Sequence, residues 1–221
     1  MNFDPLEADV DLVIWDFDGT MVDTEWPAFV SASREFERYG RVNDPEVWQN
    51  LLGSATAGPW WEQLREDVGG FDESDDEILA RYQSYKNELT DALDALPGVR
   101  GLLDAFADNG KKLAVASSSP RSWLDRHLPR LGLIERFPVI VSRDDVGAER
   151  TKPHPDLFLL AAQRSDVSPE RALVIEDSNH GVVAAKTAGM SVVAVPHRLS
   201  KMQDFSLADR VVESLEDLLP S

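Results

Sequence analysis

Leu12-Val13-Ile14-Trp15-Asp16-Phe17-Asp18-Gly19-Thr20 is the stretch of sequence that decides the fold. Its first half is β-branched and aromatic, which predicts a buried strand, and two carboxylates follow at the strand's carboxyl end. Ligands bind at that edge of an open α/β sheet, and an unpaired charge is costly to bury. Asp16 and Asp18 should therefore face water, a cation or a reacting group, as a nucleophile and a proton donor would. Asp-Gly after a strand is also typical of a hairpin turn, so this stretch alone leaves both interpretations open.

Three further polar clusters follow the apolar runs of other predicted strands. They are Ser117-Ser118-Ser119, Lys152-Pro153 and Glu176-Asp177-Ser178. Each has a structural explanation when taken alone, because serine and aspartate cap helices and Lys-Pro is an ordinary exposed turn. Four such clusters after four predicted strands are harder to explain structurally. Together they predict one functional site at one edge of a sheet.

Residues 22–96 contain helical patterns and no convincing strand. Helices are predicted at 27–39, 45–52, 59–68 and 74–93, where proline and glycine mark several of the ends. Ser74 and Glu77 match a capping box at the start of the last helix. This segment is therefore expected to be an all-helical insert.

After Pro97-Gly98 the pattern alternates regularly between strands and helices. Strands are predicted at 112–116, 138–142, 172–176 and 191–195. Such alternation implies a parallel sheet covered by helices on both faces. We expect an α/β fold, in which a doubly wound parallel sheet from residues 1–21 and 97–221 carries a helical cap, 22–96, inserted after the first strand.

The composition limits the classes of protein and partner. The 221 residues include 40 acidic and 22 basic side chains, giving a formal charge of −18, and no cysteine. Disulfides and thiolate metal sites are excluded, and the negative field disfavours nucleic acid. We see neither a signal peptide nor a run of roughly 20 apolar residues that a membrane helix needs. We expect a cytoplasmic protein that binds neither nucleic acid nor membrane and is a monomer or weak dimer.

The complete motif set resembles the haloacid dehalogenase-like (HAD) phosphohydrolase superfamily. The match comprises Asp16-x-Asp18-Gly19-Thr20, Ser117, Lys152-Pro153 and Glu176-Asp177-Ser178. Gly181 and Ala188-Gly189-Met190 extend the resemblance to the β-phosphoglucomutase-like branch. The resemblance covers nearly the whole chain and implies this core with a helical cap at this point.

The resemblance also implies roles for the motif residues in phosphoryl transfer. Asp16 would be the nucleophile, and Asp18 would protonate the leaving group and then activate water. Ser117, Ser118 and Lys152 would bind the phosphate, while Thr20 would order the first loop and belong to the substrate-binding set. Mg²⁺, which prefers oxygen ligands, would be held by Asp16 and Asp177, by the backbone carbonyl of Asp18, and by Glu176 if it is a further ligand.

The expected activity is a magnesium-dependent phosphatase acting on a small sugar or polyol phosphate. Asp18 argues against the related dehalogenases, which lack this second aspartate. Ala28 and, approximately, Thr56 stand where the β-phosphoglucomutases carry a cap histidine and arginine, which favours hydrolysis over mutation. The uncharged loop 54–58 suits hydroxyl groups better than carboxylates. A sugar phosphomutase, and a non-catalytic binding or regulatory protein, remain the alternatives.

Overall fold

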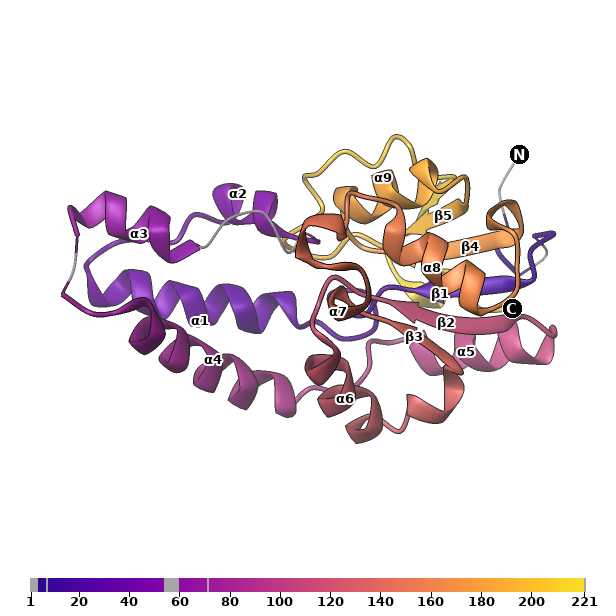
Figure 1. Ribbon diagram of the computed structural model, residues 1–221, viewed down its shortest axis with the longest axis horizontal. Helices are drawn as coiled ribbons and strands as arrows, with labels where there is room; N and C mark the ends of the chain where they lie inside the picture. The colour runs from indigo at the N-terminus through magenta and orange to yellow at the C-terminus, as the bar shows by residue number, and fades with distance from the viewer. Residues whose placement is uncertain (1–3, 7, 54–59, 71, 221) are drawn as a thin grey trace.

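The computed structural model describes residues 4–6, 8–53, 60–70 and 72–220. Within these ranges, a parallel sheet has the strand order β3-β2-β1-β4-β5-β6 (Figure 1). The strands are β1 (Leu12–Trp15), β2 (Lys112–Ala116), β3 (Val139–Val141), β4 (Ala172–Glu176), β5 (Ser191–Ala194) and β6 (Arg210–Val211). The strand order reverses beside β1, the kind of switch point at which ligands bind in open α/β sheets.

The two faces of the sheet bury alternate side chains of β1. Val13 and Trp15 belong to one apolar cluster, and Leu12 and Ile14 belong to the other. Helices α5 (Val99–Asp108) and α6 (Arg121–Arg130) cover the first face, and α8 (Asp156–Arg164) and α9 (Asn179–Thr187) cover the second. Burial on both faces explains why the central strands are almost entirely apolar. The predicted doubly wound core is confirmed.

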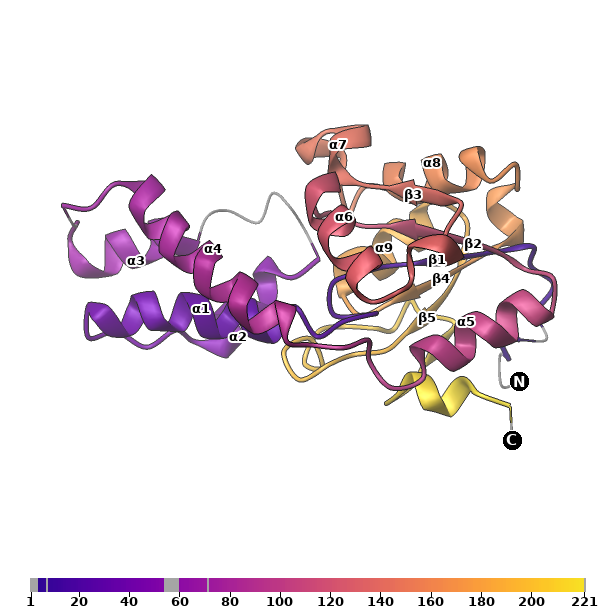
Figure 2. The same ribbon diagram turned by 90° about the horizontal axis from the view of Figure 1, so that it is seen from below.

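Helices α1 to α4 lie together at one end of the molecule, away from the sheet, in both views (Figures 1 and 2). They are α1 (Glu25–Arg38), α2 (Pro45–Trp48), α3 (Trp60–Val68) and α4 (Asp75–Asp91), with a 3₁₀ turn at Gln49–Leu51. They share an apolar cluster that includes Phe36, Trp48 and Trp60. The capping box of Ser74 and Glu77 is present at the start of α4.

The chain crosses between these helices and the sheet at two points that lie side by side. The backbone N–H of Leu96 donates to the carbonyl of Met21 at 2.8 Å, which ties the exit of the helical segment to its entrance. We propose on this basis that the cap spans residues 22–96 and the core spans 1–21 and 97–221.

Several short helical elements were not predicted from the sequence. The structure adds α7 (Arg143–Val146) and 3₁₀ turns at Ile134–Arg136, Ala148–Arg150 and Pro169–Arg171, and a further 3₁₀ turn, Leu215–Leu218, follows β6. Elements of three or four residues carry too little periodicity to be recognised in sequence. In the described ranges, none of the helices has the length and apolarity to cross a membrane.

Candidate active site

The polar clusters predicted from the sequence meet at the carboxyl edge of the sheet. Asp16 directly follows β1, and Glu176 and Asp177 stand at the end of the neighbouring strand β4. All three are buried, and each offers a carboxylate oxygen within 4.8 Å of those of the other two. Adjacent parallel strands thus create a compact acidic group from positions 160 residues apart in the chain.

Lys152 is the cation that faces this acidic group. Its ammonium donates to Asp16 Oδ1 and, at 2.7 Å, to Glu176 Oε1, and only 1% of the side chain is exposed. Burial alone would lower the pKa of Lys152, but the two carboxylates raise it above its ordinary value. Lys152 is therefore charged throughout the neutral range.

One lysine does not balance the charge of three carboxylates. Burial raises the pKa of Asp16 well above its ordinary value, and Glu176 and Asp177 add to the effect while Lys152 opposes it. A divalent cation among these oxygens would relieve the repulsion. A buried donor set made only of carboxylate oxygens fits a hard cation such as Mg²⁺.

Within that group, the Glu176 carboxylate already has several donors. Its Oε2 accepts hydrogen bonds from the backbone N–H groups of Asp177 and Ser178, both at 2.8 Å, and from Ser178 Oγ at 2.9 Å. A Cβ at Gly181 would lie 1.8 Å from Glu176 Oε1, so the start of α9 leaves room for the carboxylate only because that residue is glycine. Glu176 is thereby oriented toward Lys152 and the loop that carries Asp177.

Asp18 lines the same pocket, but its carboxylate lies outside the acidic group. Its Oδ1 accepts hydrogen bonds from Thr24 Oγ1 at 2.7 Å and Trp123 Nε1 at 2.8 Å. Its Oδ2 accepts from Ser119 Oγ at 2.6 Å and Ser117 Oγ at 3.3 Å. Of the four donors to Asp18, Ser117 and Ser119 belong to the serine cluster predicted from the sequence, and Thr24 and Trp123 do not.

Asp177 is held by one predicted residue and one unpredicted residue. Thr20 Oγ1 donates to Asp177 Oδ1 at 3.1 Å, and His197 Nε2 lies 2.8 Å from Asp177 Oδ2. Burial raises the pKa of Asp177, and the interaction with His197 opposes that rise. Gly19 has φ +85°, and a Cβ there would lie 2.4 Å from Asp177 Oδ2. Thr20 thus orders this loop by contacting Asp177, and His197 comes from a loop after β5 that had no motif to reveal it.

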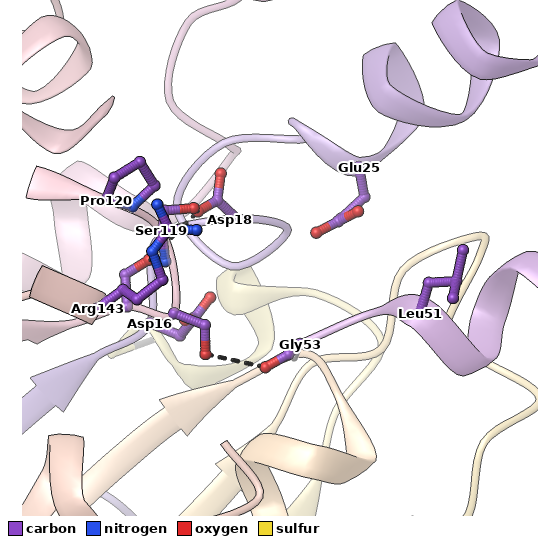
Figure 3. Close-up of a pocket in the computed structure, with 10 residues that line it drawn as sticks. Asp16, Asp18, Glu25, Leu51, Gly53, Ser119, Pro120 and Arg143 are labelled. Carbon is purple, nitrogen blue, oxygen red and sulfur yellow. Dashed lines mark hydrogen bonds between the residues drawn. The ribbon is translucent and has the colours of Figure 1, made fainter. Parts of the chain in front are cut away.

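A pocket of about 200 Å³ opens above these groups, between the core and the helical segment (Figure 3). From the core it is lined by Asp16, Asp18, Ser117, Ser118, Ser119, Pro120 and Arg143. From the helical segment it is lined by Glu25, Leu51 and Gly53, and the Glu25 carboxyl points into it. Ser118 Oγ donates to the Gly53 carbonyl at 3.0 Å, joining the two sides. The loop 54–58 and Thr56 lie outside the described residues.

Comparisons with known proteins agree with this geometry. The profile of the family described as haloacid dehalogenase-like hydrolase matches residues 13–195. The Phosphorylated carbohydrates phosphatase of Thermotoga maritima is 32% identical over 192 residues, covering 86% of this chain and 88% of that protein. The Fructose-1-phosphate phosphatase YqaB of Escherichia coli is 34% identical over 190 residues, covering 83% of this chain and 95% of that protein.

A solved structure shares the whole arrangement of core and helical segment. It is a HAD family hydrolase from Deinococcus radiodurans R1 with bound phosphate and sodium, which is 29% identical, has a TM-score of 0.77, and covers 96% of this chain and 94% of that one. The profile match over most of the chain and the two relatives above 30% identity agree with the motif geometry. The chain belongs to the haloacid dehalogenase-like hydrolase family and is a phosphoric monoester hydrolase.

Proposed function

We propose that this protein is a magnesium-dependent phosphatase that hydrolyses a small sugar or polyol phosphate through an aspartyl-phosphate intermediate. The observation that carries the proposal is the Asp16 carboxylate, which is buried against Lys152 and lines a pocket beside the serine loop Ser117-Ser118-Ser119. Phosphoryl transfer needs an in-line nucleophile, charge neutralisation and a proton donor for the leaving oxygen, and this pocket offers a candidate for each.

In this proposal Asp16 and Asp177, with the backbone carbonyl of Asp18, hold Mg²⁺. The bound ion would neutralise charge on the phosphoryl oxygens. The Glu176 carboxylate already accepts hydrogen bonds from the Asp177 loop and from Lys152. In this proposal it orients that loop and that lysine and is not a further ligand of Mg²⁺. Ser117 and Ser118 hold the phosphate together with backbone N–H groups at the start of α6.

The proposed reaction has two steps. An oxygen of Asp16 attacks phosphorus, the ester P–O bond breaks, and Asp18 gives its proton to the departing alcohol oxygen. Asp18 then takes a proton from water, the water oxygen attacks phosphorus, and the bond to Asp16 breaks, which releases inorganic phosphate. Asp18 must turn away from Thr24 and Trp123 to do this, because both side chains donate to its Oδ1 in the present structure.

The substrate class rests on the pocket and on the named activities of the relatives. A pocket of about 200 Å³ covered by a helical segment suits a small ester better than a phosphorylated macromolecule. The two relatives described above are named for phosphorylated carbohydrates and for fructose 1-phosphate. Ala28 stands where the mutases carry histidine, and it is buried in the apolar cluster of α1 to α4. Its methyl group cannot transfer a proton, so this position supplies no proton relay.

The test is release of inorganic phosphate from an aryl phosphate and from fructose 1-phosphate, with Mg²⁺ and then with a chelator. We expect turnover with Mg²⁺ only, and we expect Asp16→Asn to reduce it by at least about 10⁴-fold while the protein stays folded. Asp108→Asn, an exposed aspartate on α5, is the matched control.

Three outcomes would contradict the proposal. Substantial metal-dependent turnover by Asp16→Asn would remove Asp16 as nucleophile. Absence of phosphate release across a broad panel of esters would favour a non-catalytic binding protein. Conversion of sugar 1-phosphates into 6-phosphates, dependent on a bisphosphate activator, would instead identify a mutase.

A further inference from the structure

Glu25 is a charged residue of the pocket to which the proposed reaction gives no role. It is the first residue of α1, and its side chain points from the helical segment into the pocket, facing the core (Figure 3). Within the described ranges it makes no ion pair and no side-chain hydrogen bond. A carboxyl group that is partly buried without a partner is available to a bound ligand.

The groups that face Glu25 come from every side of the pocket. Burial raises the pKa of Glu25 to about 7, and the charge of Asp18 adds to that effect. Lys86 of α4 opposes the rise, Asp177 contributes to it, and His197 from the loop after β5 opposes it. Near neutral pH both forms of Glu25 are therefore populated. The acid donates and accepts a hydrogen bond and the carboxylate accepts one, so both forms can bind a hydroxyl group.

The position of Glu25 makes it neither nucleophile nor metal ligand. The acidic group that could hold a cation consists of Asp16, Glu176 and Asp177. Asp16, Lys152 and the serine loop all belong to the core side, so a phosphate held there directs the rest of its ester toward the helical segment. On that side the lining residues that the structure describes are Leu51, Gly53 and Glu25, and of these three only Glu25 is ionisable.

We propose that Glu25 selects the alcohol portion of the substrate, binding one of its hydroxyl groups and excluding alcohols that carry an anion. The assignment rests on the proposed phosphatase activity and adds the chemistry of the leaving group to it. A carboxylate on the alcohol would lie beside both Asp18 and Glu25, where like charges repel strongly in a pocket that is partly shielded from water. A neutral polyol meets no such repulsion and gains a hydrogen bond.

The experiment compares three substrates with different leaving groups. They are p-nitrophenyl phosphate, which offers no aliphatic hydroxyl group, fructose 1-phosphate, which offers several, and phosphoglycolate, which carries a carboxylate. The parent protein should prefer fructose 1-phosphate to phosphoglycolate. Glu25→Ala should lower kcat/KM for fructose 1-phosphate about tenfold, chiefly through KM, because one hydrogen bond is lost.

At pH 8.5, where Glu25 is mainly ionised because its pKa is about 7, the nearly isosteric Glu25→Gln should raise kcat/KM for phosphoglycolate about tenfold, because a like charge is removed. Neither variant should change kcat/KM for p-nitrophenyl phosphate by more than about threefold, since its leaving group uses no hydrogen bond to Glu25. Glu37→Gln, an exposed glutamate on the same helix, should leave all three substrates unchanged.

The outcomes separate this proposal from the activity on which it rests. If the parent cleaves p-nitrophenyl phosphate but prefers phosphoglycolate to fructose 1-phosphate, or if Glu25→Gln leaves their ratio unchanged, the role of Glu25 is wrong and the phosphatase stands. An equal loss on all three substrates would also overturn selectivity. If the parent releases no phosphate from any of them, the proposed function itself fails.

Discussion

Asp18, on the core side of the pocket, accepts hydrogen bonds from four side chains, whereas Glu25, on the opposite side, has no such partner among the described residues. The same contrast holds for the two sides as wholes. Lys152, Asp16 and Glu176 lie in a closed network of buried charges. Leu51 and Gly53, on the other side, contribute an apolar side chain and a carbonyl. The core, with Thr24 of the helical segment, therefore fixes the groups that break bonds, and the rest of the helical segment can change the ligand it accepts without disturbing them.

Of the following substitutions, removal of Lys152 should have the largest effect on the stability and activity of the core side of the pocket. Lys152→Met leaves Asp16 and Glu176 buried without their cation, which we expect to destabilise the protein by about 3–5 kcal/mol. We also expect it to lower kcat/KM by at least about 10³-fold, because it removes the lysine that neutralises the transferred phosphoryl group. Denaturant unfolding and phosphate release measure the two effects.

Lys186→Met is the control, because Lys186 pairs with Asp209 at the surface and such pairs are worth at most about 1 kcal/mol. If both lysine variants behaved alike, the network around Asp16 would not be the rigid element that we describe.

Protonation of His127 tests how strictly the core excludes an unbalanced charge. His127 is buried on α6 beneath Trp123, and burial, with the nearby charge of Arg130, lowers its pKa to about 4. The unfolded chain binds a proton near pH 6.5 while the folded state resists it, so stability is complete above that pH and falls as the pH decreases toward 4. The expected loss is about 3 kcal/mol by pH 4.

His127→Gln should remove this component, so the free energy of unfolding of the variant should fall less than that of the parent between pH 6.5 and 4. His154→Gln, at an exposed histidine, should follow the parent. Parallel curves for the parent and His127→Gln would show that the core tolerates the imidazolium.

Trp123 lies where α6 meets the pocket, and its indole N–H is one of the donors to Asp18. Trp123→Phe keeps a ring in the core but removes the donor, so we expect kcat to fall about tenfold with KM nearly unchanged. Trp61→Phe is the matched control, because its indole nitrogen is buried and has no partner in the described part of the chain. A change in KM alone would place Trp123 in substrate binding rather than in control of Asp18.

The smallest expected effect concerns the contacts between the two sides. Gln203 Nε2 donates to the Gln49 carbonyl at 2.7 Å, across the junction of core and helical segment. Gln203→Ala should change KM by about threefold at most and leave kcat for p-nitrophenyl phosphate unaltered, because the core groups do not depend on this contact. A large fall in kcat would show that the contact between Gln203 and Gln49 controls the chemical step in the core as well as substrate binding.

The same division explains what the sequence could predict. Asp16, Ser117, Lys152, Glu176 and Asp177 follow strands or lie in the loops after them, so recognising the strands was enough to predict that they converge. Other site residues belong to helix and loop surfaces whose orientation depends on packing. They are Glu25, Trp123, Arg143 and His197.

Glu25 is the clearest case of the second kind. The predicted helix began at Pro27, because proline is favoured in a first turn, and the observed helix begins two residues earlier. Its rotation, and hence the direction of Glu25, is set by contact with α4, which is 50 residues distant in sequence. Local patterns carry no information about such a contact.

The hydrogen bond between Leu96 and Met21 gives the molecule an engineering property. Where two chain crossings meet within a single hydrogen bond, a turn of a few residues is long enough to join them, and the cost of closing such a short loop is small. The helical segment could therefore be replaced by a different inserted segment, while the sheet with Asp16 and Lys152 stays the same. If Met21 were joined directly to the chain after Leu96, Asp16 would be open to bulk solvent and to phosphoesters of any size. The shortened protein would lack Thr24 and Glu25.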